Sequence, residues 1–227
     1  MHQKHFKSDD SSLFNTMSLN VDIFINNILC TFNLRCRLDL EDILERGHNV
    51  ELRESKFILM KMKKFSGTAK IWSTGKVICT GSKSEEEAKI VSRRFARQLQ
   101  ILGYNVGFAN FKIHNCHGSV LLPFQIKIKE FSQAHQEASY EPELHAGIIY
   151  KVEAFSATLR IYRSGNMTIM APSEIDVKRA VEFTANLVQT FATHTNDIQG
   201  NLGKRRKDCV KEKWQVLLMI PFVQMSN

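Results

Sequence analysis

The chain has 227 residues, of which 43% are hydrophobic, and this is enough for one large domain or two small ones with a buried core. It carries 31 lysines and arginines against 23 aspartates and glutamates, and the net charge of +8 favours an anionic partner. No stretch approaches the roughly 20 apolar residues of a membrane span, and the polar N-terminus lacks the apolar core of a signal peptide. The five cysteines form no C-x-x-C pair, so we expect reduced thiols in a cytosolic or nuclear protein.

The first part of the chain predicts a polar tail followed by strands and one short helix. Residues 1–20 are polar, and the first strand opens near Val21 and runs through Phe32. A short helix over 39–45 stops at Gly47. The runs 56–64, 68–72 and 76–80 predict antiparallel strands joined by tight turns. The clearest of these turns is Ser73-Thr74-Gly75.

A long amphipathic helix follows the strands. Ser84 and Glu87 form a capping box at its start, and Gly103 is placed to end it. One apolar stripe is formed by Ala88, Val91, Phe95, Leu99 and Leu102. The other side is basic and carries Lys89, Arg93, Arg94 and Arg97. The spacing of these four side chains also fits an ordinary solvated helix face.

The rest of the chain retraces this order and then ends in a second tail. A strand starts at 111–115, further strands cover 161–162 and 167–170, and a helix over 173–192 follows Pro172. The tail from 195 contains the basic run Lys204–Lys207, which is either a nuclear-localisation signal or a generic charged tail. Its apolar end, Trp214–Val223, either packs on the body or binds a partner.

An internal repeat organises the whole chain. The segment Ser66–Gly75 returns 90 residues later as Ser156–Gly165, with serine, threonine, isoleucine and glycine identical in place. We therefore expect a first repeat over 21–109 and a second over 110–194, flanked by tails at 1–20 and 195–227. The two repeats should form one continuous antiparallel sheet with both long helices on its convex face. Such pseudo-twofold symmetry suits a partner that is itself nearly twofold symmetric, as duplex DNA is.

Several runs resemble the TATA-box-binding protein family in register through both repeats. They are Cys36–Leu40, Gly81–Glu85, Ser92–Arg97, Phe111–Ile113 and, most specifically, Ser139-Tyr-Glu-Pro-Glu-Leu144. The resemblance covers roughly 21–193 and implies an α/β protein of the α+β kind, shaped as a saddle. Its concave face would lie on the DNA minor groove, the arrangement for which this family is a standard example of a DNA kinker.

The resemblance assigns DNA contact to residues of the sheet and its turns. They are Asn27, Leu29, Lys61, Thr68, Lys70, Trp72, Ser73, Lys76, Ile78, Thr80, Asn115, His117, Lys151, Thr158, Arg160, Tyr162 and Ser164. The four phenylalanine wedges of the family correspond here to Ser55, Trp72, His145 and Tyr162. Ser55 is too small to offset the unstacking of a base step, and His145 is smaller than phenylalanine and polar, whereas Trp72 and Tyr162 could still insert. This replacement set is similar to that of the TBP-like subfamily, whose members are regarded as not binding TATA elements.

The same resemblance implies protein partners and no cofactor. Glu141, Glu143 and Leu144 occupy positions that meet transcription factor IIB in the family, and the basic helix face occupies positions associated with transcription factor IIA. We expect a nuclear initiation factor that acts as a monomer on DNA and recruits both factors at promoters without a TATA box. Two alternatives stay open: ordinary TATA recognition, and a module that sequesters general factors without binding DNA.

Two groups of residues suggest catalysis or metal binding, but less strongly than the resemblance suggests DNA binding. Glu141 and Glu143 resemble a pair of catalytic carboxylates, but no nucleophile or metal ligand lies near them in the sequence. His114-Asn-Cys116-His117 resembles metal spacing. On a regular strand, however, His114 and Cys116 would face one side and His117 the other, and two donors per side seldom make a zinc site. We therefore expect neither catalysis nor a bound metal.

Overall fold

The computed structural model describes residues 21–53, 56–62 and 67–193, which form two similar halves. The first half contains β1 (Ile23–Asn33), α1 (Leu40–Arg46), β2 (Val50–Arg53), β3 (Phe57–Met62), β4 (Gly67–Trp72), β5 (Lys76–Ser82) and α2 (Glu85–Ile101). The second half contains β6 (Ala109–Leu121), β7 (Gln125–Ile126), α3 (Ile128–Ala134), β8 (Ala138–Ser139), β9 (Ile148–Val152), the 3-10 turn η1 (Glu153–Phe155), β10 (Ala157–Ile161), β11 (Asn166–Ala171), α4 (Glu174–Gln189) and β12 (Ala192–Thr193).

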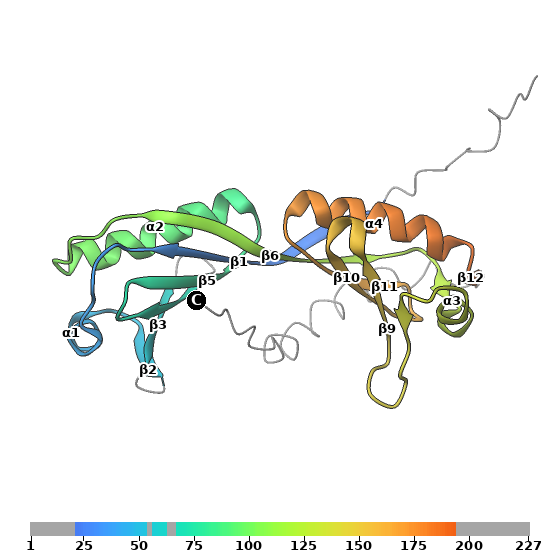
Figure 1. The fold of residues 1–227 in the computed structure, drawn as a ribbon, viewed down its shortest axis with the longest axis horizontal. Coiled ribbons are helices and arrows are strands. Elements are labelled where there is room, and N and C mark those ends of the chain that lie inside the picture. Colours follow the sequence, from blue (N-terminus) through green and yellow to red (C-terminus); the bar gives the residue numbers. More distant parts are fainter. Residues whose placement is uncertain (1–20, 54–55, 63–66, 194–227) are drawn as a thin grey trace, which may run out of the picture.

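One antiparallel sheet runs through both halves (Figure 1). Its ten strands lie in the order β2-β3-β4-β5-β1-β6-β11-β10-β9-β8, so the halves meet where β1 pairs with β6. Asn27 lies opposite His117 and Leu29 opposite Asn115 in this pair. The predicted continuous sheet is confirmed.

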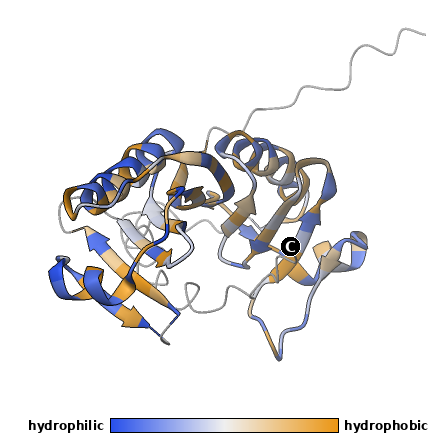
Figure 2. Cartoon of the chain, turned by 60° about the vertical axis from the view of Figure 1, so that its left-hand side comes forward, coloured by the Kyte–Doolittle hydropathy of each residue, from blue (hydrophilic) through white to orange (hydrophobic). Residues whose placement is uncertain are grey.

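Both long helices cover the same face of the sheet, as predicted (Figure 1). Val91, Phe95 and Leu99 of α2 are fully buried, as are Val177 and Val188 of α4. Figure 2 shows hydrophilic and hydrophobic residues alternating along both helices, which is the pattern of a helix with one face on a core. The sheet is thus packed on one face and open on the other.

The start and end of α2 follow the predicted signals with one difference. The Ser84 hydroxyl accepts a hydrogen bond from the Glu87 amide at 3.1 Å. In a standard capping box the Glu87 carboxylate would accept a hydrogen bond from the amide of the cap residue, Ser84. Here it accepts from the amide of the preceding residue, Lys83, at 2.7 Å. Gly103 follows the helix with φ of +99°, a conformation that glycine adopts at little cost.

The first turns of α2 and α4 meet above the seam between the halves. The Glu85 amide donates to the Glu174 carboxylate at 2.6 Å, and the Glu174 amide donates to the Glu85 carboxylate at 3.0 Å. Each helix therefore supplies an acceptor for an otherwise unpaired amide of the other helix.

The second long helix is shorter than predicted. It ends at Gln189, three residues before the expected end at Ala192. The Thr190 hydroxyl donates to the Leu187 carbonyl at 2.8 Å, and the Phe191 ring packs edge-on against Phe131 with centroids 5.4 Å apart. These contacts accompany the end of the helix. The chain then continues as a short strand, in which Ala192 pairs with Ile126 in a small second sheet.

Candidate nucleic-acid interface

The concave face, defined as the face of the sheet opposite α2 and α4, gathers most of the predicted DNA-contact residues. In β4, Ala69 and Ile71 are fully buried, whereas Thr68, Lys70 and Trp72 alternate with them and point to the other side. The same alternation in β10 brings Thr158, Arg160 and the following Tyr162 to the concave face. The predicted residues on this face are Asn27, Leu29, Lys61, Thr68, Lys70, Trp72, Lys76, Ile78, Thr80, Asn115, His117, Lys151, Thr158, Arg160 and Tyr162.

Strand pairing shows that four of these side chains, in the second half and at its junction with the first, share one face. Residues directly opposite each other on antiparallel strands point to the same side. Lys151 lies opposite Thr158, Thr158 opposite Met170, Met170 opposite His117, and His117 opposite Asn27. This chain of pairs crosses the second half and reaches the seam.

Two of the predicted residues lie in turns between strands. Ser73 lies in the turn between β4 and β5, where its carbonyl accepts a hydrogen bond from the Leu38 amide at 2.9 Å. Ser164 lies in the matching turn between β10 and β11, and its hydroxyl accepts from the Asn166 amide at 3.4 Å. Their side chains belong to the ends of the saddle.

Two side-chain contacts link β1 and β6 at the seam, and they join matching positions of the two repeats. The Asn26 amide group donates to the Ser119 hydroxyl, and the Thr31 hydroxyl lies within hydrogen-bond distance of His114 Nε2, both at 2.8 Å. Asn26 and His114 each occupy an irregular position in the β1–β6 register. His114 therefore reaches the concave face, while Cys116 is fully buried on the helix side. The expectation that these two side chains share a side is wrong, because the irregularity shifts His114 out of the alternation.

The two central asparagines have different surroundings. The Asn27 side-chain oxygen accepts a hydrogen bond from the Gly81 amide at 2.7 Å. The Asn115 side-chain oxygen is buried and has no hydrogen-bond partner among the described residues. The second half thus keeps an unsatisfied acceptor at the centre of the concave face.

The positive charge of the concave face comes from lysine and arginine. Burial and the nearby Arg160 guanidinium lower the pKa of His117 below its ordinary value. Burial, followed by Lys112 and Lys76, lowers the pKa of His114. Both imidazoles are therefore neutral at pH 7.

The first-half end of the concave face carries an aromatic pair that the sequence reasoning missed. Phe57 lies directly opposite Trp72, with ring centroids 5.4 Å apart. The Lys70 ammonium lies 5.5 Å from the centroid of the Phe57 ring. The available signal was the alternation of Phe57 and Leu59 with the buried Ile58. Ser55, the predicted wedge position, lies outside the described residues.

The second-half end has no counterpart of this pair. Ile148 lies opposite Ile161, which places Gly147 opposite Tyr162. A Cβ atom at Gly147 would lie 3.0 Å from the Tyr162 ring, so the ring occupies the space that a side chain would need. His145, the predicted wedge position, is exposed in the loop before β9.

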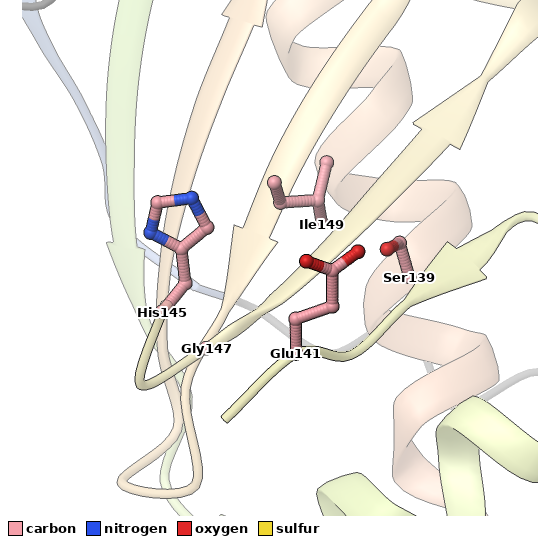
Figure 3. Close-up of a pocket in the computed structure, with 5 residues that line it drawn as sticks. All are labelled: Ser139, Glu141, His145, Gly147 and Ile149. Atoms are coloured by element: carbon pink, nitrogen blue, oxygen red, sulfur yellow. The ribbon is translucent and has the colours of Figure 1, made fainter. Parts of the chain in front are cut away.

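A small pocket lies beside that loop (Figure 3). Its volume is about 230 Å³, and its lining residues are Ser139, Glu141, His145, Gly147 and Ile149. Figure 3 shows the Glu141 carboxylate between the His145 ring and the Ser139 hydroxyl. The Glu141 carbonyl accepts hydrogen bonds from the amides of Leu144 and His145, which hold the loop as a turn. Leu144 is 69% exposed, so the predicted partner residues Glu141, Glu143 and Leu144 form one open surface.

The basic side of α2 is solvent-facing as predicted, except at one position. Lys89, Arg93 and Arg97 are exposed, and Arg94 is half-buried. The Arg93 guanidinium lies 5.6 Å from the Phe108 ring centroid, and Arg97 donates to the Gln100 side chain at 2.7 Å. These contacts hold two cations in place on the convex side.

Other site types find no support in the described part of the chain. Within residues 21–53, 56–62 and 67–193, no group of three histidine, cysteine, aspartate or glutamate side chains can hold a metal ion. No helix in the same ranges is long and apolar enough to cross a membrane. The four cysteines described there are free thiols.

Comparison with known proteins identifies the fold and the family. The family model described as "Transcription factor TFIID (or TATA-binding protein, TBP)" matches residues 22–102 and again 110–191. TATA box-binding protein-like 1 of Danio rerio is 43% identical over 164 residues, which cover 71% of this chain and 88% of that protein. TATA box-binding protein-like 2 of Mus musculus is 37% identical over 172 residues, which cover 74% of this chain and 49% of that protein. This chain therefore spans about half the length of the mouse relative.

A solved structure has the same architecture. The Methanococcus jannaschii TBP superimposes with a TM-score of 0.66 at 24% identity, covering 74% of this chain and 99% of that one. The family model accounts for both halves separately, in agreement with the repeated strand order and the paired helices. The chain thus belongs to the TATA-binding protein family, a family of transcription factors and not of enzymes, and it is similar to TBP-like members of that family.

Proposed function

We propose that this chain is a transcription initiation factor of the TBP-like type, which associates with duplex DNA and recruits transcription factors IIA and IIB at promoters without a TATA box. The observation that carries the proposal is the pair of cations, Lys70 and Arg160, at matching positions on the concave face. In the proposed complex, one copy of the chain lies on the minor groove through that face.

The two cations favour DNA association with little sequence preference. The minor groove presents a degenerate pattern of hydrogen-bonding groups, so an apolar face distinguishes A·T steps by shape and contact. Lys70 is exposed and Arg160 is half-buried on the concave face, where both would be attracted to phosphates of any sequence. The expected result is binding that weakens steeply with salt and that hardly favours a TATA element.

Two exposed charged surfaces, the Glu141–Leu144 loop and the basic side of α2, support the recruitment of protein partners. In the first half, Glu51 is paired with Arg53 at 2.8 Å and with Lys61 at 3.1 Å. In the second half, neither Glu141 nor Glu143 takes part in an ion pair between described side chains. Their open negative charge, with Leu144 beside it, suits a basic partner surface, for which we propose factor IIB. The exposed cations of α2 suit an acidic surface, for which we propose factor IIA.

A gel shift across a salt series, with TATA and random duplexes, tests the proposed function. We expect similar affinities for the two duplexes and a steep loss of binding with salt for both. The variant with Lys70→Leu and Arg160→Leu should flatten the salt dependence and raise the relative affinity for TATA. A TATA preference above about a hundredfold in the unaltered protein, roughly 2.8 kcal/mol, would contradict the proposal. It would favour ordinary TATA recognition, which the Phe57–Trp72 ring pair supports.

A second candidate function is sequestration of general factors without DNA. The observation that favours it is that the Glu141–Leu144 loop and the basic side of α2 are both exposed, and that α2 packs on the face of the sheet opposite the concave one. Adding purified factors IIA and IIB to the same gel shift distinguishes the two functions. Factors that bind the chain without DNA, and that do not join it on DNA, would support sequestration.

Nuclear localisation is part of the proposal and rests on the family. The candidate import signal, Lys204–Lys207, lies outside the described residues. Replacing these four residues by glutamine should shift a fluorescent fusion from the nucleus to the cytoplasm. An unchanged nuclear signal would show that import depends on another segment.

A further inference from the structure

We propose that the Phe57–Trp72 end of the concave face is a binding site for an unstacked nucleotide base. The protein would then prefer a duplex that contains unpaired or mismatched bases, and it would bind with that defect at its first half. The inference rests on the proposed function, because it uses the same face, and it adds a class of ligand and an orientation.

The ring pair lies where a ligand can reach it. Ile58 and Ile71, the neighbours of Phe57 and Trp72 along the strands, are fully buried beneath the helices. Phe57 and Trp72 themselves are only partly buried and project from the open face. Two large rings on an uncovered face offer apolar area that the core does not use.

The second half cannot offer the same platform. Gly147 has no side chain to set beside Tyr162, and the Tyr162 ring lies against the glycine backbone. The adjoining pocket holds the Glu141 carboxylate, which would repel a phosphate, whereas the charge of its first-half counterpart Glu51 is offset by ion pairs with Arg53 and Lys61. A base that leaves the stack therefore finds a two-ring surface at one end of the saddle and not at the other.

Charge follows the same asymmetry. On the concave face, the first-half side of the sheet carries four lysines, namely Lys61, which is paired with Glu51, and Lys70, Lys76 and Lys112. Their counterparts in the repeat are Lys151, Arg160, Asn166 and Phe24. The first-half side thus has two more cations than the second-half side on this face to attract the DNA backbone.

The chemistry of stacking explains why a defective step is preferred. Aromatic side chains stack on any base, because every base has a flat π-face, and nearby cations hold the phosphates. A paired base must first be unstacked, whereas a mismatched or unpaired base has already lost much of that energy. The first-half platform should therefore favour a duplex with two unpaired thymines over its matched form by about tenfold.

The test compares three short labelled DNAs of related sequence: a matched duplex, the same duplex with two unpaired thymines, and a single strand. Affinities of the full chain are measured by fluorescence anisotropy at constant salt. We expect the defective duplex to bind about tenfold tighter than the matched one. Phe57→Ala and Trp72→Ala should each remove most of this preference. Tyr162→Ala, the counterpart of Trp72, and Leu59→Ala, on the same strand and face as Phe57, should keep it.

Tryptophan fluorescence locates the base. The chain has two tryptophans, so Trp214→Phe leaves Trp72 as the sole emitter. Its emission should be quenched more strongly by the defective duplex than by the matched one. Circular dichroism of each variant checks that the fold is kept, and Phe57→Leu, which keeps apolar bulk but not the flat ring, replaces Phe57→Ala if that variant is unfolded.

The outcomes separate this inference from the proposed function. Equal binding of matched and defective duplexes would overturn the inference and leave DNA association intact. A preference that survives in both Phe57→Ala and Trp72→Ala would also overturn it, because the defect would then be recognised elsewhere. Failure to bind any of the three DNAs would refute both the inference and the proposed DNA association.

Discussion

The two halves of the saddle share a frame and differ on their open surfaces. Ile71 and Ile161, at matching positions of the repeat, are both fully buried, and Ser84 and Ser173 both cap long helices. On the concave face, by contrast, Phe57 faces Trp72 where Gly147 faces Tyr162. Packing keeps most buried positions apolar in both halves, whereas an exposed position can change its chemical character in one half alone. The concave face, where a partner would bind, thus differs between the halves.

The core differs between the halves as well, and one such difference gives the largest expected effect. Phe95 in α2 and Thr184 in α4 each lie eleven residues after the helix cap, and both are fully buried. Phe95→Ala should lower the free energy of unfolding by about 3–5 kcal/mol, because it removes a large ring from a packed core. Urea unfolding followed by circular dichroism measures this loss. A loss below about 1.5 kcal/mol would mean that the first half collapses around the cavity far better than such cores do.

Substitutions in the Glu141–Leu144 loop test whether the two halves differ in partner binding. Glu143→Arg should weaken factor IIB binding at least about tenfold, roughly 1.4 kcal/mol, because it places a like charge against a basic partner. The matched control is Arg53→Glu at the corresponding position of the first half, which should leave the affinity unchanged. Pull-downs at low salt provide the measurement. Equal effects of the two variants would show that factor IIB does not distinguish the halves.

A histidine on the seam makes the second half sensitive to pH. The counterpart of His117 in the repeat is Leu29, so this titration has no equivalent in the first half. Because the folded pKa of His117 is lowered from 6.5, its contribution to stability is complete above that value and is lost as pH falls below it. Arg160→Leu should raise the pKa and reduce this acid loss. A nuclear magnetic resonance titration of the His117 ring measures the shift, and an unchanged pKa would exclude Arg160 as a cause.

The smallest expected effect comes from the core threonine of α4. The Thr184 hydroxyl is buried and has no hydrogen-bond partner among the described residues. Thr184→Val keeps the shape and removes this unsatisfied group, so we expect a gain of about 0.5–1 kcal/mol in unfolding free energy. The same urea experiment detects it. A destabilised variant would indicate that the hydroxyl is hydrated in solution.

Local patterns predicted the frame of the fold but not its exact register. The turn at Ser73–Gly75, the cap at Ser84 and the repeat itself were sufficient for most of the longer strands and for the two long helices, and the family resemblance implied the same side of the sheet for both helices. The pairing of Phe57 with Trp72 depends on how two strands align across an intervening segment, and neither strand specifies that alignment alone. The displacement of His114 arises from an irregularity between β1 and β6, which leaves no mark in a single strand.

Short elements were missed for a related reason. β2 has four residues, of which three are exposed, so it shows little of the apolar alternation that marks a strand. α3 has seven residues and no side-chain hydrogen bond at its N-terminal cap, so it lacks a starting signal. Tertiary contacts, not local preference, define such elements.

The reciprocal contact of Glu85 and Glu174 has a consequence for how this architecture arose. Each helix start is completed by the same residue type of the other half, and β1 and β6 pair with each other across the same axis. This is the geometry of an isologous dimer interface, in which residue i contacts residue j and j contacts i. A single ancestral half with this surface would have assembled as a homodimer. Fusion of the two copies makes that association intramolecular and independent of protein concentration, and it frees each half to acquire its own ligand.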